Sequence, residues 1–227
     1  MLHQLGPAAA DAVIYFHGGP GGTMTDDVFP ANVVGRLIAP GRDVVTVEYS
    51  GSQGGGMALT RRLAGRGLRA IEEDVEALVR WLDRQHYHRV FVIGTSFGAV
   101  PALAAAHHSG RFAGIFYIAP LLQLRAPGDW VRSTPIPAMT DTHLAFELAY
   151  LGGPDGRRRF AADLAALLAA APLRAGDHFY FGDRDRVSRA EDLPTGARAS
   201  IRVLPGTHHM AMLASPAMWE DILARMH

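Results

Sequence analysis

The stretch RVFVIGTSFGAVPALAAA (residues 89–106) decides the fold. Its first six residues form an apolar run typical of a buried strand, and the small residues of 98–108 follow a pattern typical of a helix. Between them lies GTSFG (94–98), a Gly-x-Ser-x-Gly sequence. A sharp strand-to-helix turn strains the backbone at its serine, and flanking glycines remove side chains that would clash. The pattern therefore predicts that the Ser96 hydroxyl is presented at the end of a strand as a nucleophile, rather than being a serine in an ordinary tight turn.

Further apolar runs alternate with helical patterns along the chain. Amphipathic spacing predicts a helix over 67–85, and Ser215 with Pro216 predicts the start of another over 215–226. The runs are apolar throughout, which favours strands that are covered on both faces. We therefore predict an α/β fold with a mostly parallel central sheet and helices on both faces. The further strands are expected at 12–19, 43–51, 114–120, 177–183 and 199–206.

The region 121–173 breaks this alternation. It begins with a segment rich in proline and turn residues (125–141), continues with two helical patterns (142–153 and 156–172), and contains no strand pattern. We interpret it as a helical insertion after the 114–120 strand, able to lie over the edge where the strands end. The predicted core then comprises 1–120 and 174–227.

Composition narrows the functional classes. The chain has 227 residues and a formal net charge of zero, so nothing draws it to nucleic acid or to an anionic membrane. It has no cysteine, which excludes disulfides, thiolate nucleophiles and cysteine-ligated zinc. No apolar run approaches the roughly 20 residues of a membrane span, and the first residues do not resemble a signal peptide. We expect a cytoplasmic protein that acts on a small molecule without a metal or cofactor. The sequence does not predict its oligomeric state.

Two more features lie in loops that follow predicted strands, where open α/β sheets bind ligands. HGGPGG (17–22) lets backbone N–H groups approach a ligand, which suits an oxyanion hole formed by Gly19 and Phe97. The alternative, a phosphate-binding turn, normally requires a lysine, and this chain has none: all 22 basic residues are arginine.

The third feature is a pair of loops, FGDRDRV (181–187) and LPGTHHM (204–210). Together with Ser96 they supply the order serine, acid, histidine that a hydrolytic triad uses. The histidine would act as general base and the acid would orient it. The residues alone leave two choices for the acid, Asp183 or Asp185, and two for the base, His208 or His209.

With these motifs the chain resembles the α/β-hydrolase superfamily over nearly its whole length. HGGPGG is similar to the same string in the proline iminopeptidase branch, although Glu48 and Ser50 stand where that branch has Asp and Arg. The N-terminus is also shorter than usual and can hold one strand at most. The family's loop patterns imply Asp185 and His209 as the triad members, with Asp183 and His208 as second choices.

The resemblance also implies that 121–173 is a helical cap that sets substrate choice. In the proline iminopeptidase branch, acids of the cap hold the free amine of the substrate, which makes Glu147 and Asp141 candidates. The alternative is that Glu147 is a solvated helix residue. The other candidate substrate-binding residues are Gly18 in the core and Trp130, Phe146 and Tyr150 in the cap. This apolar set would suit an apolar or aromatic acyl group.

These features predict a serine hydrolase that cleaves an ester, thioester or amide bond of a small, partly apolar substrate through an acyl-enzyme. One alternative is an aminopeptidase like proline iminopeptidase. Another is a lyase, cyclase or ligand-binding protein that uses the same fold without hydrolysis.

Overall fold

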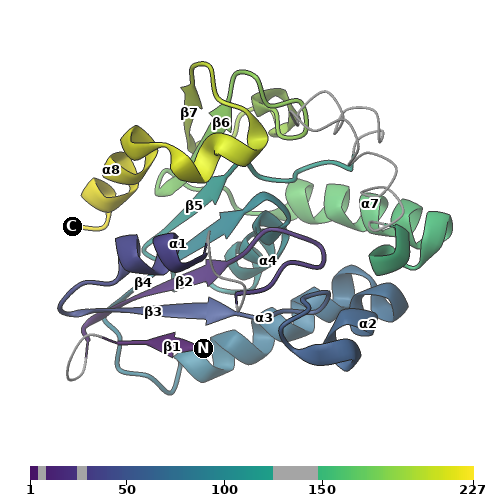
Figure 1. The fold of residues 1–227 in the computed structure, drawn as a ribbon, viewed down its shortest axis with the longest axis horizontal. Coiled ribbons are helices and arrows are strands. Elements are labelled where there is room, and N and C mark those ends of the chain that lie inside the picture. Colours follow the sequence, from purple (N-terminus) through teal and green to yellow (C-terminus); the bar gives the residue numbers. More distant parts are fainter. Residues whose placement is uncertain (5–8, 25–29, 125–147) are drawn as a thin grey trace.

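A seven-stranded sheet runs through the centre of the molecule (Figure 1). The computed structural model describes residues 1–4, 9–24, 30–124 and 148–227. The strand order is β1-β3-β2-β4-β5-β6-β7; all neighbours are parallel except β1, which is antiparallel to β3. All six predicted strands are present, and one short strand precedes them. The strands are β1 (Leu2–His3), β2 (Asp11–Phe16), β3 (Arg42–Val47), β4 (Arg89–Thr95), β5 (Gly114–Ile118), β6 (Asp177–Gly182) and β7 (Ser200–Leu204).

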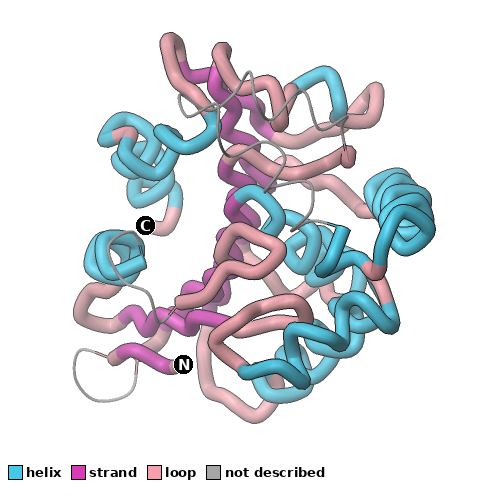
Figure 2. Tube along the Cα trace, turned by 45° about the vertical axis from the view of Figure 1, so that its right-hand side comes forward, coloured by secondary structure: helices cyan, strands magenta, loops and turns pink. Residues whose placement is uncertain are grey.

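Helices cover both faces of the sheet, as predicted (Figure 2). One apolar cluster joins α2, α3, α4 and α7 to the sheet, and a second cluster joins α1 and α8 to the opposite face. The helices that the structure bounds are α1 (Pro30–Leu37), α2 (Gly56–Arg66), α3 (Leu68–Leu82), α4 (Ala99–His108), α7 (Gly153–Ala170) and α8 (Pro216–Arg225).

The alternation of side chains explains why the strands are apolar throughout. In β2, Ile14 and Phe16 enter the first cluster, whereas Val13 and Tyr15 enter the second. Successive residues of a strand point to opposite faces, so a strand covered on both faces needs apolar residues at every position. The edge strand β7 differs, because two of its large apolar side chains remain about half exposed: Ile201 at 48% and Val203 at 50%.

The predicted closing helix is confirmed in detail. It begins at Pro216, and the Ser215 side chain caps it by accepting a hydrogen bond of 3.3 Å from the Met218 N–H. Two helices, α1 and α2, were not predicted. Their sequences give weak patterns: α2 buries only Leu63 of its residues, and α1 has Gly35 in its interior.

The predicted insertion contributes α7, which packs on α4 and α3. It buries Phe160, Leu164 and Leu167 in the first apolar cluster. Residues 125–147, with Trp130, Phe146 and Glu147, lie outside the described residues, so the cap assignment and its bounds remain predictions.

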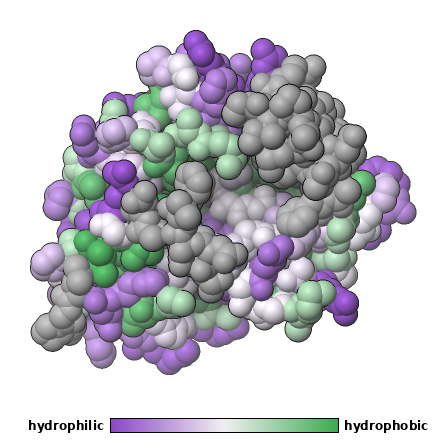
Figure 3. All heavy atoms as spheres, viewed as in Figure 1, coloured by the Kyte–Doolittle hydropathy of each residue, from purple (hydrophilic) through white to green (hydrophobic). Residues whose placement is uncertain are grey.

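The surface seen in Figure 3 is hydrophilic over most of its rim, and its hydrophobic residues form small separate groups. Within the described part of the chain, the helices are too short or too polar to span a bilayer.

Candidate active site

Ser96 lies at the turn between β4 and α4, in a short 3₁₀ segment of residues 96–98. Its φ angle is +53°, in the region that side-chain-bearing residues rarely adopt. The flanking glycines are required by close packing. A Cβ at Gly94 would lie 2.5 Å from the carbonyl oxygen of Gly98. One at Gly98 would lie 2.5 Å from that of His17. The motif therefore forms the strained turn that the sequence predicted.

The loop after β5 holds the backbone of this turn. The Leu121 N–H donates a hydrogen bond of 2.9 Å to the carbonyl oxygen of Ser96. Two residues earlier, Ala119 also has a positive φ, +43°, and its N–H donates to the Tyr180 carbonyl. Sequence reasoning missed this support, because neither alanine nor leucine signals such a role.

The structure brings together Ser96, His209 and Asp185. The Ser96 Oγ lies 2.9 Å from His209 Nε2, and His209 Nδ1 lies 2.7 Å from Asp185 Oδ2. The three residues come from the ends of β4, β7 and β6, and all are buried or nearly so, at 9%, 7% and 6% exposure. A continuous chain of hydrogen bonds thus runs from the hydroxyl to the carboxylate.

The partners of Asp185 indicate which nitrogen of His209 carries a proton in this series of hydrogen bonds. The second oxygen of Asp185, Oδ1, accepts hydrogen bonds from the Val187 N–H at 2.8 Å and the Ser188 N–H at 3.0 Å. An ionised carboxylate can only accept, so the His209 Nδ1 carries the proton in its bond to Oδ2. In the neutral imidazole, Nε2 is then free to accept the proton of the Ser96 hydroxyl.

The second-choice residues, Asp183 and His208, are not part of this series of hydrogen bonds. Asp183 Oδ1 accepts a hydrogen bond of 3.2 Å from the Thr207 N–H, which ties the loop after β6 to the loop after β7. The Nδ1 of His208 is buried without a hydrogen-bond partner among the described residues. Of the two possible acids and two possible bases, the structure thus places His209 beside Ser96 and Asp185 beside His209.

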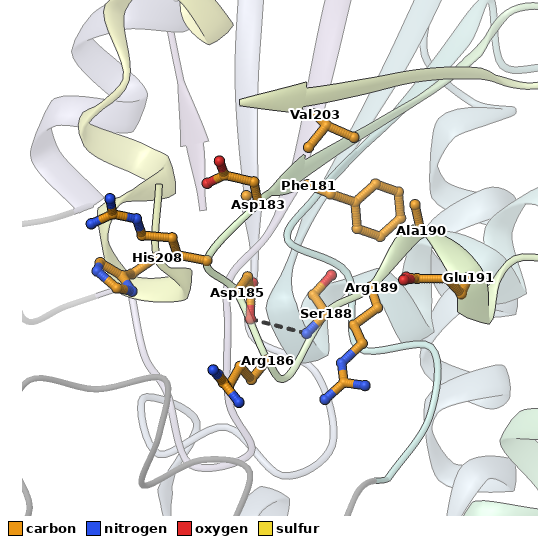
Figure 4. Close-up of a pocket in the computed structure, with 12 residues that line it drawn as sticks. Phe181, Asp183, Asp185, Arg186, Ser188, Arg189, Ala190, Glu191, Val203 and His208 are labelled. Atoms are coloured by element: carbon orange, nitrogen blue, oxygen red, sulfur yellow. Dashed lines mark hydrogen bonds between the residues drawn. The ribbon is translucent and has the colours of Figure 1, made fainter. Parts of the chain in front are cut away.

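A cavity of about 710 Å³ adjoins the loop after β6 (Figure 4). Asp185 contributes to its wall, whereas the described residues Ser96 and His209 do not. In Figure 4, Arg186 and Arg189 point away from Asp183, on the opposite side of the loop. The wall mixes these arginines with Asp183 and Glu191, so its charge does not select one class of ligand.

The turn predicted to form the oxyanion hole lies next to Ser96. A Cβ at Gly18 would be 3.4 Å from the Ser96 Cβ, so the turn passes directly beside the serine. Phe97 lies in the 3₁₀ turn of residues 96–98 that leads into α4, where N–H groups lack partners within the helix. Its ring is fully buried and stacks on Phe160 at 5.5 Å and on Tyr49 at 6.3 Å.

Sequence reasoning missed the residues that support this turn from the loop after β3. Glu48 Oε1 accepts hydrogen bonds from the Met24 N–H at 2.6 Å and the Thr23 hydroxyl at 3.1 Å. Burial raises the pKa of Glu48, but contact with His17 and these hydrogen bonds outweigh burial and lower it to about 2. The carboxylate is therefore ionised at neutral pH. Its position directly after a buried strand was the signal that could have identified it.

Tyr150, predicted to contact substrate, is buried at 8% exposure. Its hydroxyl accepts a hydrogen bond of 2.8 Å from Gln53 Nε2. The backbone N–H of Gln53 in turn donates to the Gly22 carbonyl at 3.0 Å. Tyr150 thus connects the predicted insertion to the turn beside Ser96.

Solved structures with the same architecture identify the fold. A proline iminopeptidase-related protein from Thermus thermophilus is 25% identical, with a TM-score of 0.63 over 99% of this chain and 92% of that one. This chain has the α/β-hydrolase fold. A structure described among two metagenome-derived lipolytic enzymes has a TM-score of 0.63 at 18% identity, covering 97% of this chain and 95% of its own. An esterase from Pyrococcus furiosus has a TM-score of 0.62 at 17% identity, covering 95% and 81%.

No family model matches the chain, and no curated protein matches it either. The likeness to the lipolytic enzyme and the esterase, at these identities, concerns the α/β-hydrolase fold alone. The chemistry must therefore be argued from the residues beside Ser96.

Proposed function

We propose that the protein is a serine hydrolase that cleaves an ester, thioester or amide bond of a small, partly apolar substrate through an acyl-enzyme. The observation that carries this proposal is the hydrogen-bonded chain of Ser96, His209 and Asp185, with the serine at a strained strand-to-helix turn. An ordinary tight turn would not require a buried base and a buried acid in line with the hydroxyl.

The geometry suits acyl transfer in two steps. Ser96 Oγ attacks the substrate carbonyl carbon and transfers its proton to His209 Nε2. The imidazolium, stabilised by Asp185, then gives this proton to the leaving group, and the acyl group stays on Ser96. A water molecule next attacks the acyl carbon, His209 accepts one of its protons, and the returning serine oxygen is reprotonated as the acid product leaves. The N–H groups of Gly19 and Phe97 would stabilise the negative oxygen formed in both steps.

Replacing Ser96 by alanine tests the proposal on a panel of p-nitrophenyl esters of increasing acyl length. We expect the kcat of the best substrate to fall on the order of 10⁴- to 10⁶-fold, because the variant lacks the attacking oxygen. Ser109→Ala, at the end of α4, is the matched control and should keep full activity. Turnover retained by Ser96→Ala would rule out the assigned nucleophile.

A second candidate is an aminopeptidase that requires a free substrate amine. The HGGPGG turn and the 25% identity to the proline iminopeptidase-related protein favour it. Matched aminoacyl anilides and esters, each with free and blocked amines, separate the two activities. The peptidase candidate predicts faster cleavage of the free amines and loss of that selectivity in Glu147→Gln. Equal rates for free and blocked substrates would favour the esterase or thioesterase activity.

A further inference from the structure

The ring of His17 contacts the peptide that carries the predicted oxyanion donor. His17 Nδ1 lies 2.7 Å from the carbonyl oxygen of Gly18. A carbonyl only accepts hydrogen bonds, so Nδ1 carries the proton. The peptide between Gly18 and Gly19 is trans, and the N–H of a planar trans peptide points opposite to its carbonyl. The imidazole therefore sets the direction of the Gly19 N–H.

Close packing leaves this contact little freedom. A Cβ at Gly22 would lie 2.7 Å from His17 Nδ1 and still closer to the Gly18 oxygen. Only glycine at position 22 allows the imidazole and the carbonyl to meet. Because Gly18 also passes beside Ser96, a small rotation of this peptide would move the Gly19 N–H relative to the reacting carbonyl.

The His17 ring is itself held on several sides. Its Nε2 lies 3.0 Å from Ser52 Oγ, which also accepts the Tyr49 N–H at 3.1 Å. The Tyr49 ring stacks on the imidazole at 4.8 Å, and its hydroxyl donates to the His17 carbonyl at 2.7 Å. His17 is 5% exposed, so its ring lies within the packed interior.

The Glu48 carboxylate connects the ring to the far end of the same turn. Its Oε2 lies 3.6 Å from His17 Nε2, and its Oε1 accepts the hydrogen bonds from Thr23 and Met24. One side chain thus contacts both the residue before the glycines and the residues after them.

From these contacts we propose that His17 is a positioning residue that orients the Gly19 N–H toward the substrate oxyanion, and that Ser52 and Glu48 hold it in place. This inference rests on the proposed hydrolase function for its catalytic consequence. The orientation of the turn can be measured independently of activity.

Two variants separate the roles of the two ring nitrogens. The amide nitrogen of asparagine can occupy the place of Nδ1, whereas that of glutamine reaches the place of Nε2. We expect His17→Gln to lower kcat on the best ester roughly 100-fold with KM within about threefold, the effect of losing one oxyanion donor. His17→Asn should stay within about tenfold of the wild type. His108→Gln, an exposed histidine on α4, is the control. Equal losses in the asparagine and glutamine variants would overturn the role of Nδ1.

Amide hydrogen exchange of peptides covering 17–24 gives the second measurement. Exchange should be faster in His17→Gln than in the wild type and in His17→Asn, with thermal melting to confirm that each variant is folded. Ser52→Ala, which keeps the imidazole, should show a smaller change in the same direction. Unchanged exchange in His17→Gln would overturn the positioning role even if activity fell. If the wild type shows neither hydrolysis nor labelling of Ser96 by a fluorophosphonate, the proposed function fails. The exchange data alone then decide the role of His17.

Discussion

Ser96 is held in a backbone conformation that it would not adopt freely. A side chain in a sparsely populated φ/ψ region costs on the order of 1–3 kcal/mol, and such strain persists only where the surroundings determine it. Here the surroundings are the hydrogen bond from Leu121 and the close approach of Gly98 to the backbone of β2. The strained turn places the hydroxyl at hydrogen-bonding distance from His209.

Gly98→Ala tests this close packing. The added Cβ would meet the carbonyl oxygens of Phe16 and His17, which are backbone atoms that cannot swing away. We expect the free energy of unfolding to fall by about 1–3 kcal/mol or more, as in other overpacked cores. Urea denaturation measures the change.

The matched control is Gly35→Ala in the middle of α1, where an added Cβ has no atom within 4 Å among the described residues. Alanine favours a helix over glycine by up to about 1 kcal/mol, so this variant should be neutral or more stable. Equal destabilisation by the two substitutions would contradict the packing argument.

At the level of elements, α8 is anchored to the last two strands through Asp221. Its Oδ2 accepts hydrogen bonds from the Tyr180 hydroxyl of β6 at 2.7 Å and from Arg225 Nε at 3.0 Å. Arg202 of β7 lies 3.3 Å from its Oδ1. Burial raises the pKa of Asp221, but these partners outweigh it, and the pKa lies below the ordinary value of 3.8.

This anchor predicts a pH dependence of stability. A carboxylate whose pKa is lowered by folding stabilises the protein fully above its unfolded pKa, and this contribution is lost as the pH falls through its folded pKa. Asp221→Asn should therefore be less stable than the wild type at pH 7. The difference in unfolding free energy between the two proteins should shrink as the pH falls below about 4. Urea denaturation at several pH values measures it.

Asp83→Asn is the control, because Asp83 pairs with Arg111 at the surface and its side chain is 61% exposed. Exposed ion pairs contribute little, so this variant should follow the wild type at every pH. If the difference in unfolding free energy between the wild type and Asp221→Asn grew as the pH fell, the assigned role of Asp221 would be contradicted.

The sequence indicated elements where pattern and packing agree. The strands 89–94 and 114–120 were recognisable because both of their faces are buried, and 67–85 because its buried positions recur at helical spacing. Helix α2 was missed because it buries little, and no local pattern marks it.

The site was predictable only in part. The candidate triad residues Ser96, Asp185 and His209 could be picked out because each lies in a loop that follows a predicted strand, in the chain order serine, acid, histidine. The contacts of His17 and Glu48 join segments about 30 residues apart, so only the folded chain reveals them.

At the scale of the whole molecule, α7 belongs to the same apolar cluster as α3 and α4. Its Phe160 is 1% exposed and stacks on Phe97, the residue that follows Ser96. The end of the predicted insertion therefore contributes to the core beneath the turn that carries Ser96. We expect α7 and the sheet to unfold together.

Phe160→Ala tests this cooperativity. Truncating a buried phenylalanine costs about 3–5 kcal/mol, so the single thermal transition should shift to lower temperature without splitting in two. Arg158→Ala, whose side chain on the same helix is 72% exposed, should change stability by no more than about 0.5 kcal/mol. Calorimetry distinguishes the outcomes, since an early, separate transition in Phe160→Ala would show that α7 unfolds independently.

The central claim is that Ser96 is a nucleophile activated by His209 and Asp185. Its most direct test is reaction of the folded protein with a fluorophosphonate, followed by intact-mass and peptide mass spectrometry. We predict one adduct per chain, located on Ser96. It should be absent in Ser96→Ala and form at least about 100-fold more slowly in His209→Ala, which lacks the general base. Absence of an adduct in the folded wild-type protein, or an adduct on another residue, would contradict the account.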